Sequence, residues 1–191
     1  MIALEADIET PDSSTIFTQF PGIVADHHIM DFIRDYFRLM VGGSMNSYEI
    51  ENLMDVELET HHTEAHDPIA AISSISDGLP GFGIVAAVLG VVITMGAIGG
   101  PPAELGHKVG AALVGTFLGI LLAYGIVGPI ANALTHRMHE EANFYLCLKT
   151  IIVAHLNGYS PANAVEFGRK AIYSKYRPSF EDLEESIKQR K

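Results

Sequence analysis

The sequence predicts an all-α membrane protein in which two transmembrane helices form a hairpin between helical flanks. Three observations predict this fold class. Two long stretches carry no charge, the segments around them repeat apolar residues at helical spacing, and no segment shows the alternation typical of a strand. The expected domains are an acidic helical domain at 1–77, a membrane hairpin at 78–135 and a helical region at 136–191.

The N-terminal domain is expected to contain two amphipathic helices. Apolar residues between Ile29 and Met40 recur every three or four positions, and the pair Gly42-Gly43 ends that helix. Asn46 followed by Glu49 resembles a capping box, which predicts the start of a second helix. The apolar face of this second helix consists of Ile50, Leu53, Met54 and Leu58.

Histidines gather at the end of this acidic domain. His62 and His66 are four positions apart, so they could share a helical face as the ligands of some zinc sites do. The commoner use of such residues is a solvated, polar helix end, here before Pro68, and we expect that and no metal centre. The candidate ligands are His61, His62, Glu64, His66 and Asp67.

The charge-free stretches are long enough to cross a bilayer. Gly78–Ala103 has 26 residues and Val109–Thr135 has 27 residues without Asp, Glu, Lys or Arg. A membrane helix needs about 20 such residues, so we expect spans at about Pro80–Ile98 and Val109–Ile130 with a short connection between them. The alternative is a buried helical hairpin of a soluble protein, in which two adjacent stretches of this length are hard to explain.

The region after the hairpin is expected to be helical as well. Apolar residues between Phe144 and His155 form one face until an Asn-Gly pair at 157–158 turns the chain. Ser160, followed by proline, predicts the N-cap of another helix, and Ser179 predicts a last short helix that runs to about Gln189.

Basic residues predict the orientation in the membrane. The connection between the spans holds only Lys108, whereas two basic residues precede the spans and nine follow them, from Arg137 on. Because cytoplasmic segments are enriched in Lys and Arg, we expect the connection outside the cell and both termini of this chain in the cytoplasm.

Composition excludes several functions. Twelve basic residues against 23 acidic ones give a net charge of −11, which is unfavourable for binding nucleic acid. A single cysteine, Cys147, precludes an internal disulfide. No phosphate loop, nucleophile elbow or paired-cysteine metal site is visible, so we expect neither an enzyme nor a cofactor. The acidic run Asp55, Glu57 and Glu59 is expected to be a solvated face or an electrostatic docking surface.

Neither expected span contains a group that titrates near neutral pH. Their polar side chains are Thr94, Thr116 and Tyr124, with Asn132 near the end. If the chain helps to conduct ions, the titrating group must therefore come from elsewhere.

Small residues in the spans stand at close-packing spacing. Gly115, Gly119 and Ala123 are four apart, as are Gly83 and Ala87. Such faces let helix backbones approach, either within one subunit or against a partner's helix. Pro80 and Pro129 bracket the spans, where proline kinks a helix or marks its start or end.

Long motifs along the whole chain resemble the MotA family of flagellar stator subunits. They are ALEADIE (3–9), DFIRDYFRLM (31–40), MNSYEIENLMDVELETH (45–61), GIVAAVLGVV (83–92), VGTFLGILLAYG (114–125), LNGYSPANAVEFGRKAIYS (156–174) and RPSFEDLEE (177–185). The wider superfamily includes the ExbB and TolQ energising subunits, but the cytoplasmic motifs favour the flagellar branch.

The resemblance implies a four-span subunit of the inner membrane that forms a ring, a pentamer, around a dimer of MotB. MotB supplies the membrane aspartate that binds the ion, and the cytoplasmic region touches the rotor protein FliG. This chain would hold the last two of the four spans, so we expect the 191-residue chain alone not to power rotation.

The resemblance also implies roles for single residues. Pro80 and Pro129 match the prolines linked to torque, and Thr116 matches the threonine that faces the ion path. Ala87 stands where sodium-driven relatives have threonine, so protons are the expected coupling ion, because alanine offers no oxygen ligand. Glu5 matches the acidic member of the rotor-facing pair, whose basic partner would lie upstream of Met1.

Two other functions remain alternatives from the sequence. One is an ExbB/TolQ-type energiser of an envelope complex, which a TonB-like partner would favour. The other is a non-conducting membrane scaffold whose acidic domain only docks partners.

Overall fold

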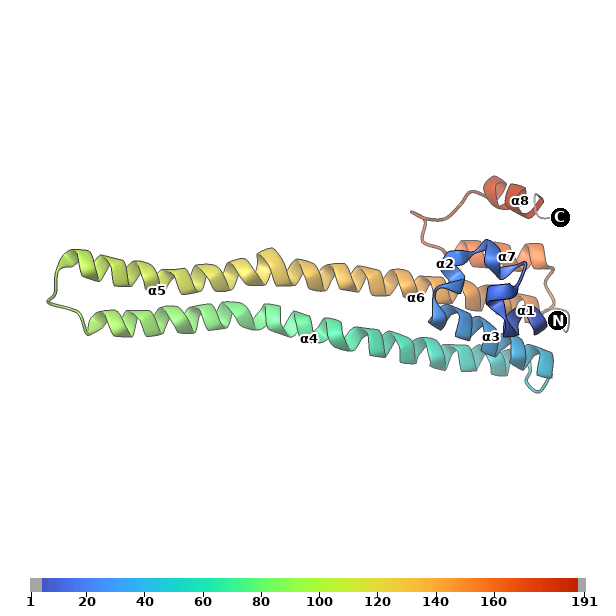
Figure 1. Cartoon of the computed structure of the whole chain (residues 1–191), viewed down its shortest axis with the longest axis horizontal. Coiled ribbons are helices and arrows are strands. Elements are labelled where there is room, and N and C mark those ends of the chain that lie inside the picture. Colours follow the sequence, from blue (N-terminus) through green and yellow to red (C-terminus); the bar gives the residue numbers. More distant parts are fainter. Residues whose placement is uncertain (1–4, 189–191) are drawn as a thin grey trace. The chain divides into compact units, whose positions relative to one another are not determined.

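The computed structural model describes residues 5–188 and, for side chains, the residues from Asp7 on; over this part the chain is helical and has no strand. It divides into two compact units (Figure 1). The hairpin unit comprises His61–Glu140, and the flanking unit comprises the residues up to Thr60 and from Glu141 on. The unit boundaries thus fall inside two long helices, away from the domain boundaries that the sequence predicts at 77 and 135.

The long helices are α4 (Ser47–Met95), α5 (Pro102–Leu122) and α6 (Gly128–Leu156). A single π-helical turn, η4 (Ala123–Val127), joins α5 to α6. The remaining elements are α1 (Glu5–Glu9), η2 (Pro11–Ser13), η3 (Phe17–Gln19), α2 (Pro21–Val24), α3 (His27–Gly42), α7 (Pro161–Ala171) and α8 (Phe180–Lys188). Gln189, the expected end of the last helix, lies outside the described residues.

The core of the flanking unit is built by α3, the start of α4 and the end of α6. Its aromatic centre places the Phe32 ring 4.7 Å from Tyr36 and 5.4 Å from Tyr145, measured between ring centroids. The predicted stripe on α3 faces this core. On α6 the inward face includes Tyr145 and Ile152, whereas Phe144 and His155, the two ends of the predicted stripe, are exposed. On α4, Leu53 of the predicted face is exposed as well. The buried residues of the cluster are Phe32, Tyr36, Ile50, Met54, Tyr145 and Ile152.

Capping signals set the helix ends of this unit. Gly43 follows α3 with a φ of 61°, the left-handed conformation that favours glycine at a helix end. The Asn46 side chain accepts from the Glu49 amide at 3.0 Å, and the Glu49 carboxylate accepts from the Asn46 amide at 2.8 Å, which is the capping box expected from the sequence. Ser160 likewise accepts from the Asn163 amide at the start of α7.

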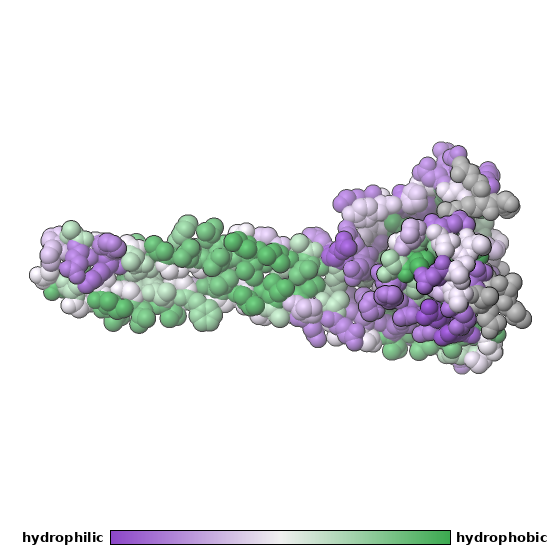
Figure 2. All heavy atoms as spheres, viewed as in Figure 1, coloured by the Kyte–Doolittle hydropathy of each residue, from purple (hydrophilic) through white to green (hydrophobic). Residues whose placement is uncertain are grey.

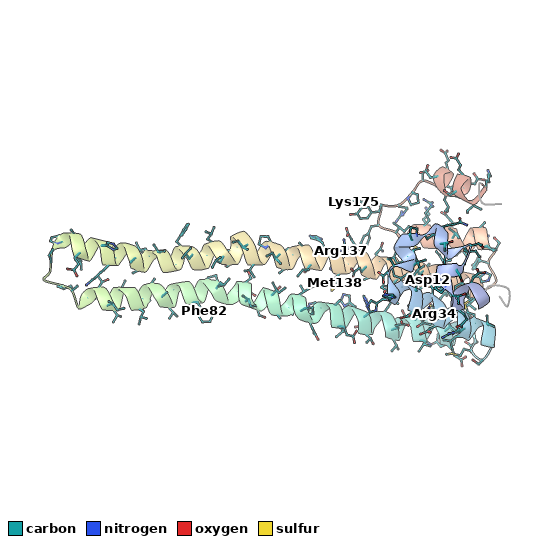
Figure 3. The ribbon with its side chains drawn as sticks, viewed as in Figure 1. Asp12, Arg34, Phe82, Arg137, Met138 and Lys175 are labelled. Carbon is teal, nitrogen blue, oxygen red and sulfur yellow. The ribbon has the colours of Figure 1, made fainter. Side chains whose placement is uncertain are left out.

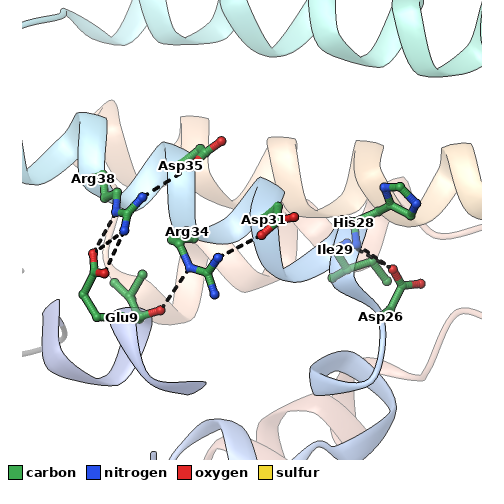
Figure 4. A network of polar contacts seen from close by, with 9 residues as sticks. Glu9, Asp26, His28, Ile29, Asp31, Arg34, Asp35 and Arg38 are labelled. Atoms are coloured by element: carbon green, nitrogen blue, oxygen red, sulfur yellow. Dashed lines mark hydrogen bonds and ion pairs between the residues drawn. The ribbon is translucent and has the colours of Figure 1, made fainter. Parts of the chain in front are cut away.

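Ion pairs attach the short N-terminal elements to α3 (Figure 4). The Arg38 guanidinium donates twice to Glu9 at 2.7 Å, and Arg34 donates to the carbonyl of Ile8 and to Asp31. Asp26 caps α3 by accepting from the amides of residues 28 and 29. Polar contacts, together with the buried Ile8 and Pro11, thus position this segment.

Helix α4 differs from expectation because it does not stop at its prolines. Pro68 and Pro80 both lie inside the helix, so the stretch His61–Asp67 is mid-helix and not a helix end before Pro68. Each proline removes one main-chain donor and costs about 3 kcal/mol in an isolated helix. The helix nevertheless continues through both prolines, with Ile50, Met54 and Ile69 buried on it.

The hairpin connection is also shorter than expected. It comprises residues 96–101, because Pro102 takes the first position of α5, where its missing N–H is no loss. The expected connection reached Lys108, which instead lies on α5 and pairs with Glu104 at 2.9 Å. The helix that contains the second expected span therefore begins earlier than Val109.

Many large apolar side chains of the hairpin unit are exposed, and on the face that Figure 2 shows they follow the middle of the hairpin, with a hydrophilic group at its tip. Only 11% and 17% of the most apolar stretches of its two long helical arms is buried. The buried hairpin of a soluble protein, the alternative left open by the sequence, would instead have most of these apolar stretches buried. This surface is suited to hydrocarbon, and the two arms are long enough to cross a bilayer.

Candidate functional site: the seam of the membrane hairpin

Helices α4 and α5 approach each other most closely along a row of small residues. A methyl group added at Gly83 would lie 2.9 Å from the Gly115 carbonyl oxygen and 3.2 Å from the Cα atom of Gly119. One added at Gly119 would lie 2.7 Å from the Leu79 carbonyl oxygen. The glycines expected to form a packing face therefore meet within this hairpin, backbone against backbone.

The same seam continues toward the connection. A methyl group at Gly90 would lie 2.5 Å from the Cβ atom of Ala112, which is buried. Ala87, in the middle of the seam, is half-buried, and its amide nitrogen lies 3.6 Å from where a Gly115 Cβ atom would be. The sequence did not single out Gly90 or Ala112, although both fall on the helical spacing that continues the stripe.

Thr116 is held at the seam by a bond to the other helix. Its hydroxyl donates to the Gly83 carbonyl oxygen at 3.3 Å, and the side chain is half-buried. Thr94, by contrast, donates to the Gly90 carbonyl of its own helix at 2.7 Å. Thr116 thus offers an oxygen that is fixed in place between α4 and α5, whereas the Thr94 hydroxyl is used within its own helix.

The seam ends at the π turn η4. The amide of Gly128 donates to the carbonyl of Ala123, five residues back, and Ala123 is fully buried. Ser76 of α4 donates its hydroxyl to the same carbonyl at 3.0 Å. Pro129 follows immediately, at an exposed position near the start of α6.

Pro80 lies one turn before Gly83 on the facing helix. It is half-buried inside α4 and cannot donate to the carbonyl of Ser76, four residues earlier. The resemblance singles out Pro80 and Pro129. Pro80 lies four residues after Ser76, and Pro129 directly follows Gly128, so each proline is close in sequence to a residue that donates to the Ala123 carbonyl. Sequence reasoning missed Ser76, which stands four residues before Pro80.

The structure does not bring the histidine candidates together as metal ligands. The His62 ring lies near His139 of α6, with 6.3 Å between ring centroids. Among the residues that the structure describes, no group of three or more His, Cys, Asp or Glu side chains is arranged to hold a metal ion.

The acidic face of α4 is partly paired. Lys149 of α6 lies 2.6 Å from Asp55 and 3.8 Å from Glu51. Glu57 accepts a hydrogen bond from the buried Tyr36 hydroxyl at 2.5 Å. Two members of the acidic run at 55–59 therefore have partners within the flanking unit and are not simply solvated.

Burial and ion pairing shift several pKa values in the flanking unit. Burial, followed by the hydrogen bond to Glu57, raises the pKa of Tyr36, and burial raises the pKa of Tyr145 to about 12. Burial also raises the pKa of the Cys147 thiol, so it is a poor nucleophile. The Arg169 guanidinium holds the pKa of Glu166 below its usual range.

Arg169 fixes the C-terminal segment. It is buried, forms a two-pronged ion pair with Glu166 at 2.6 Å and donates to the Pro178 carbonyl at 2.9 Å. Ser179 and Asp182 then cap α8 through reciprocal bonds. Glu5, the residue matched to rotor contact, lies in α1, but its side chain is outside the described residues.

Residues 24–145 match the model of the MotA/TolQ/ExbB proton channel family. The chain is 51% identical over 188 residues to Motility protein A of Escherichia coli (strain K12) and 50% identical to that of Salmonella typhimurium, covering 98% of this chain and 64% of each relative. It is 38% identical over 181 residues to Chemotaxis protein LafT of Vibrio parahaemolyticus, with 95% and 64% of the two chains covered. The chain thus spans less than two thirds of the length of these relatives.

Two solved structures share the fold. The flagellar MotAB stator complex from Bacillus subtilis matches with a TM-score of 0.68 at 24% identity, over 75% of this chain and 56% of that one. The MotAB structure from C. jejuni matches with a TM-score of 0.72 at 15% identity, over 94% and 69%. With a lipid-suited hairpin, a seam of small residues and a family match over most of its length, the chain belongs to the MotA/TolQ/ExbB proton channel family.

Proposed function

We propose that this chain is part of a flagellar motor stator subunit, which couples ion flow across the inner membrane to torque on the rotor. The observation that carries the proposal is the 51% identity to Motility protein A over 98% of the chain. The hairpin supports it, because its seam is tight and holds a fixed hydroxyl at Thr116. The ExbB/TolQ-type energiser is less favoured, because the relatives reported above are motility and chemotaxis proteins.

The ion-binding carboxylate is proposed to come from a partner. Neither charge-free stretch, 78–103 or 109–135, contains Asp, Glu, Lys, Arg or His. A carboxylate in a membrane needs a polar surface beside it, and the Thr116 hydroxyl is the best placed group to provide one. A MotB-like single-span helix with a membrane aspartate fits this requirement, and MotAB complexes are the structural neighbours.

Protons are the proposed coupling ion. Sodium requires several oxygen ligands, and the side chain of Ala87, half-buried at the seam, supplies none. The site needs no cofactor for this activity, because the chemistry is transfer of a proton to and from the partner's carboxylate. We further propose a ring of subunits, a pentamer, and contact with FliG through the flanking unit, including Glu5.

A chimera tests the proposed function. The segment of Escherichia coli Motility protein A that aligns with this chain is replaced by all 191 residues, and the gene is expressed in a strain that lacks its own copy. The remaining third of the relative is thereby supplied. We expect the chimera to restore swimming, and we expect Thr116→Val in it to abolish swimming because the seam hydroxyl is lost.

Thr94→Val is the matched control, because this hydroxyl bonds only to its own helix. It should leave swimming intact. A chimera that reaches the membrane at normal levels and binds MotB, yet does not support swimming, would contradict the stator function. Restoration of TonB-dependent uptake in an ExbB-deficient strain would instead favour the energiser.

A further inference from the structure

The π turn η4 is joined to α4 by one buried polar contact. Ser76 is 6% exposed and Ala123 is fully buried, so their bond of 3.0 Å is shielded from water. The Ala123 carbonyl also accepts from the Gly128 amide, which closes the π turn. One oxygen therefore receives both the bond that defines the turn and the bond that ties it to the facing helix.

A π turn contains one residue more than the α-helical turn it replaces. In a regular helix the ring of Pro129 would clash with the carbonyl four residues earlier, that of Gly125. The extra residue moves this carbonyl aside and lets α5 continue into α6 without a break. The turn consequently fixes the rotation of α6 about its axis.

The buried face of α6 reflects that rotation. Ala131 and Met138, seven positions apart, are 5% and 6% exposed, whereas Arg137 is exposed (Figure 3). If η4 became α-helical, α6 would turn by about 100° and each buried position would pass to the preceding residue. Arg137 would then replace Met138 on the buried face.

We propose that Ser76 is a positioning residue for this junction: its hydroxyl holds η4 in the π form and thereby sets the rotation of α6. The proposal rests on the proposed function in one respect, because it makes Ser76 necessary for torque through the segment that contains Pro129. A chain in which this bond breaks and re-forms has two discrete rotations of α6.

Gly128 provides an independent way to disturb the same bond. A methyl group there would lie 3.0 Å from the Ala123 carbonyl oxygen and 3.3 Å from the Ser76 hydroxyl oxygen. Gly128→Ala should therefore weaken the contact from the α6 side. Because both changes act on one bond, Ser76→Ala and Gly128→Ala should be non-additive when combined.

The first test measures the rotation of α6 in the chimera with its MotB partner, in a Cys147→Ser background. A cysteine at 138 or at 137 is labelled with a water-soluble maleimide. Ser76→Ala should raise the labelling rate at 138 by about threefold, the effect of losing one interhelical hydrogen bond, and lower it at 137. Ser76→Cys cannot be used here, because it would add a second thiol. Ser76→Thr keeps the hydroxyl and should show the labelling rates of the protein with Ser76.

Ser74→Ala is the matched control, because Ser74 is exposed and its hydroxyl donates to the carbonyl of Ala70 in its own helix at 2.9 Å. The second test is stall torque, which Ser76→Ala should lower and Ser74→Ala should not. Unchanged labelling at 137 and 138 in Ser76→Ala overturns the proposal. If the parent chimera does not swim, the stator function fails, while labelling still decides the role of Ser76.

Discussion

Glycine hydrogens make the close approach of α4 and α5 possible. At Gly83 and Gly119 an added methyl group would meet backbone atoms of the opposite helix, which cannot rotate away as a flexible side chain would. At Gly110, on the same helix as Gly119, it would meet nothing within 4 Å. Position relative to the seam therefore decides whether alanine destabilises or stabilises this hairpin.

Gly119→Ala should lower the stability of the hairpin by about 1–3 kcal/mol, the usual cost of an overpacked site. Gly110→Ala should raise it by about 0.5–1 kcal/mol, because alanine is the better helix former. Thermal unfolding of the two variants in detergent measures the difference. A methyl group at Gly119 would lie only 2.7 Å from the Leu79 carbonyl oxygen. Equal melting temperatures would show that the seam is looser than this distance implies.

Ala87 offers a test of ion choice at a single atom. In the swimming chimera, Ala87→Thr adds one oxygen at the seam, and Ala87→Val adds the same shape without it. We expect swimming speed to depend on sodium concentration in Ala87→Thr and not in Ala87→Val, because only an oxygen ligates sodium. If both variants respond alike to sodium, shape and not ligation matters at this position.

The helical elements show what the sequence can and cannot predict. The capping box at Asn46 and Glu49 and the glycine end of α3 are local signals, and the structure confirms both. Pro68 is a local signal too, but α4 passes through it, and the next residue, Ile69, is buried. Short-range rules hold where nothing distant competes with them.

The candidate site divides in the same way. Four-residue spacing predicted that Gly115 and Gly119 form a close-packing face, but spacing alone could not decide which helix they meet. The π turn had no spacing signal, since it depends on the position of Pro129 and on Ser76, 47 residues from Ala123. Ser76 is one of several polar residues just before an apolar, proline-containing stretch, and nothing in the sequence distinguishes it from Ser73, Ser74 and Asp77.

Two tyrosines should make the flanking unit unstable in alkali. Burial raises the pKa of Tyr36 and raises that of Tyr145 to about 12, above the usual value of 10. A raised tyrosine pKa favours the folded, protonated form, so its contribution is complete below pH 10 and is lost as pH rises toward the folded pKa. The loss is about 1.4 kcal/mol per pH unit for each tyrosine.

Denaturant unfolding of the detergent-solubilised chain, followed by circular dichroism between about pH 9 and 11, checks this, because the range brackets the usual tyrosine pKa of about 10. Tyr145→Phe should reduce the slope with which the free energy of unfolding falls above pH 10. Tyr173→Phe, at an exposed ring, should leave this slope unchanged. A slope that is the same in all three proteins would place the alkaline transition elsewhere.

At the scale of the whole chain, the net charge and the orientation in the membrane depend on different residues. The net charge of −11 comes mainly from the acidic residues before the first span, yet acidic residues contribute little to orientation in a membrane. Orientation depends on Lys and Arg, of which the chain has one between the spans and nine after them. An acidic N-terminal region and a cytoplasmic location are therefore compatible.

The connection at 96–101 should lie outside the cytoplasm, with both flanks inside it. In a Cys147→Ser background, an Ala103→Cys variant beside the connection should react with a membrane-impermeant maleimide in intact cells, after passage through the outer membrane. Ser186→Cys, at an exposed position on α8, should react only once the inner membrane is opened. The reverse pattern would place the flanking unit outside, where it could not reach a cytoplasmic rotor, and the proposed function would then fail for topological reasons alone.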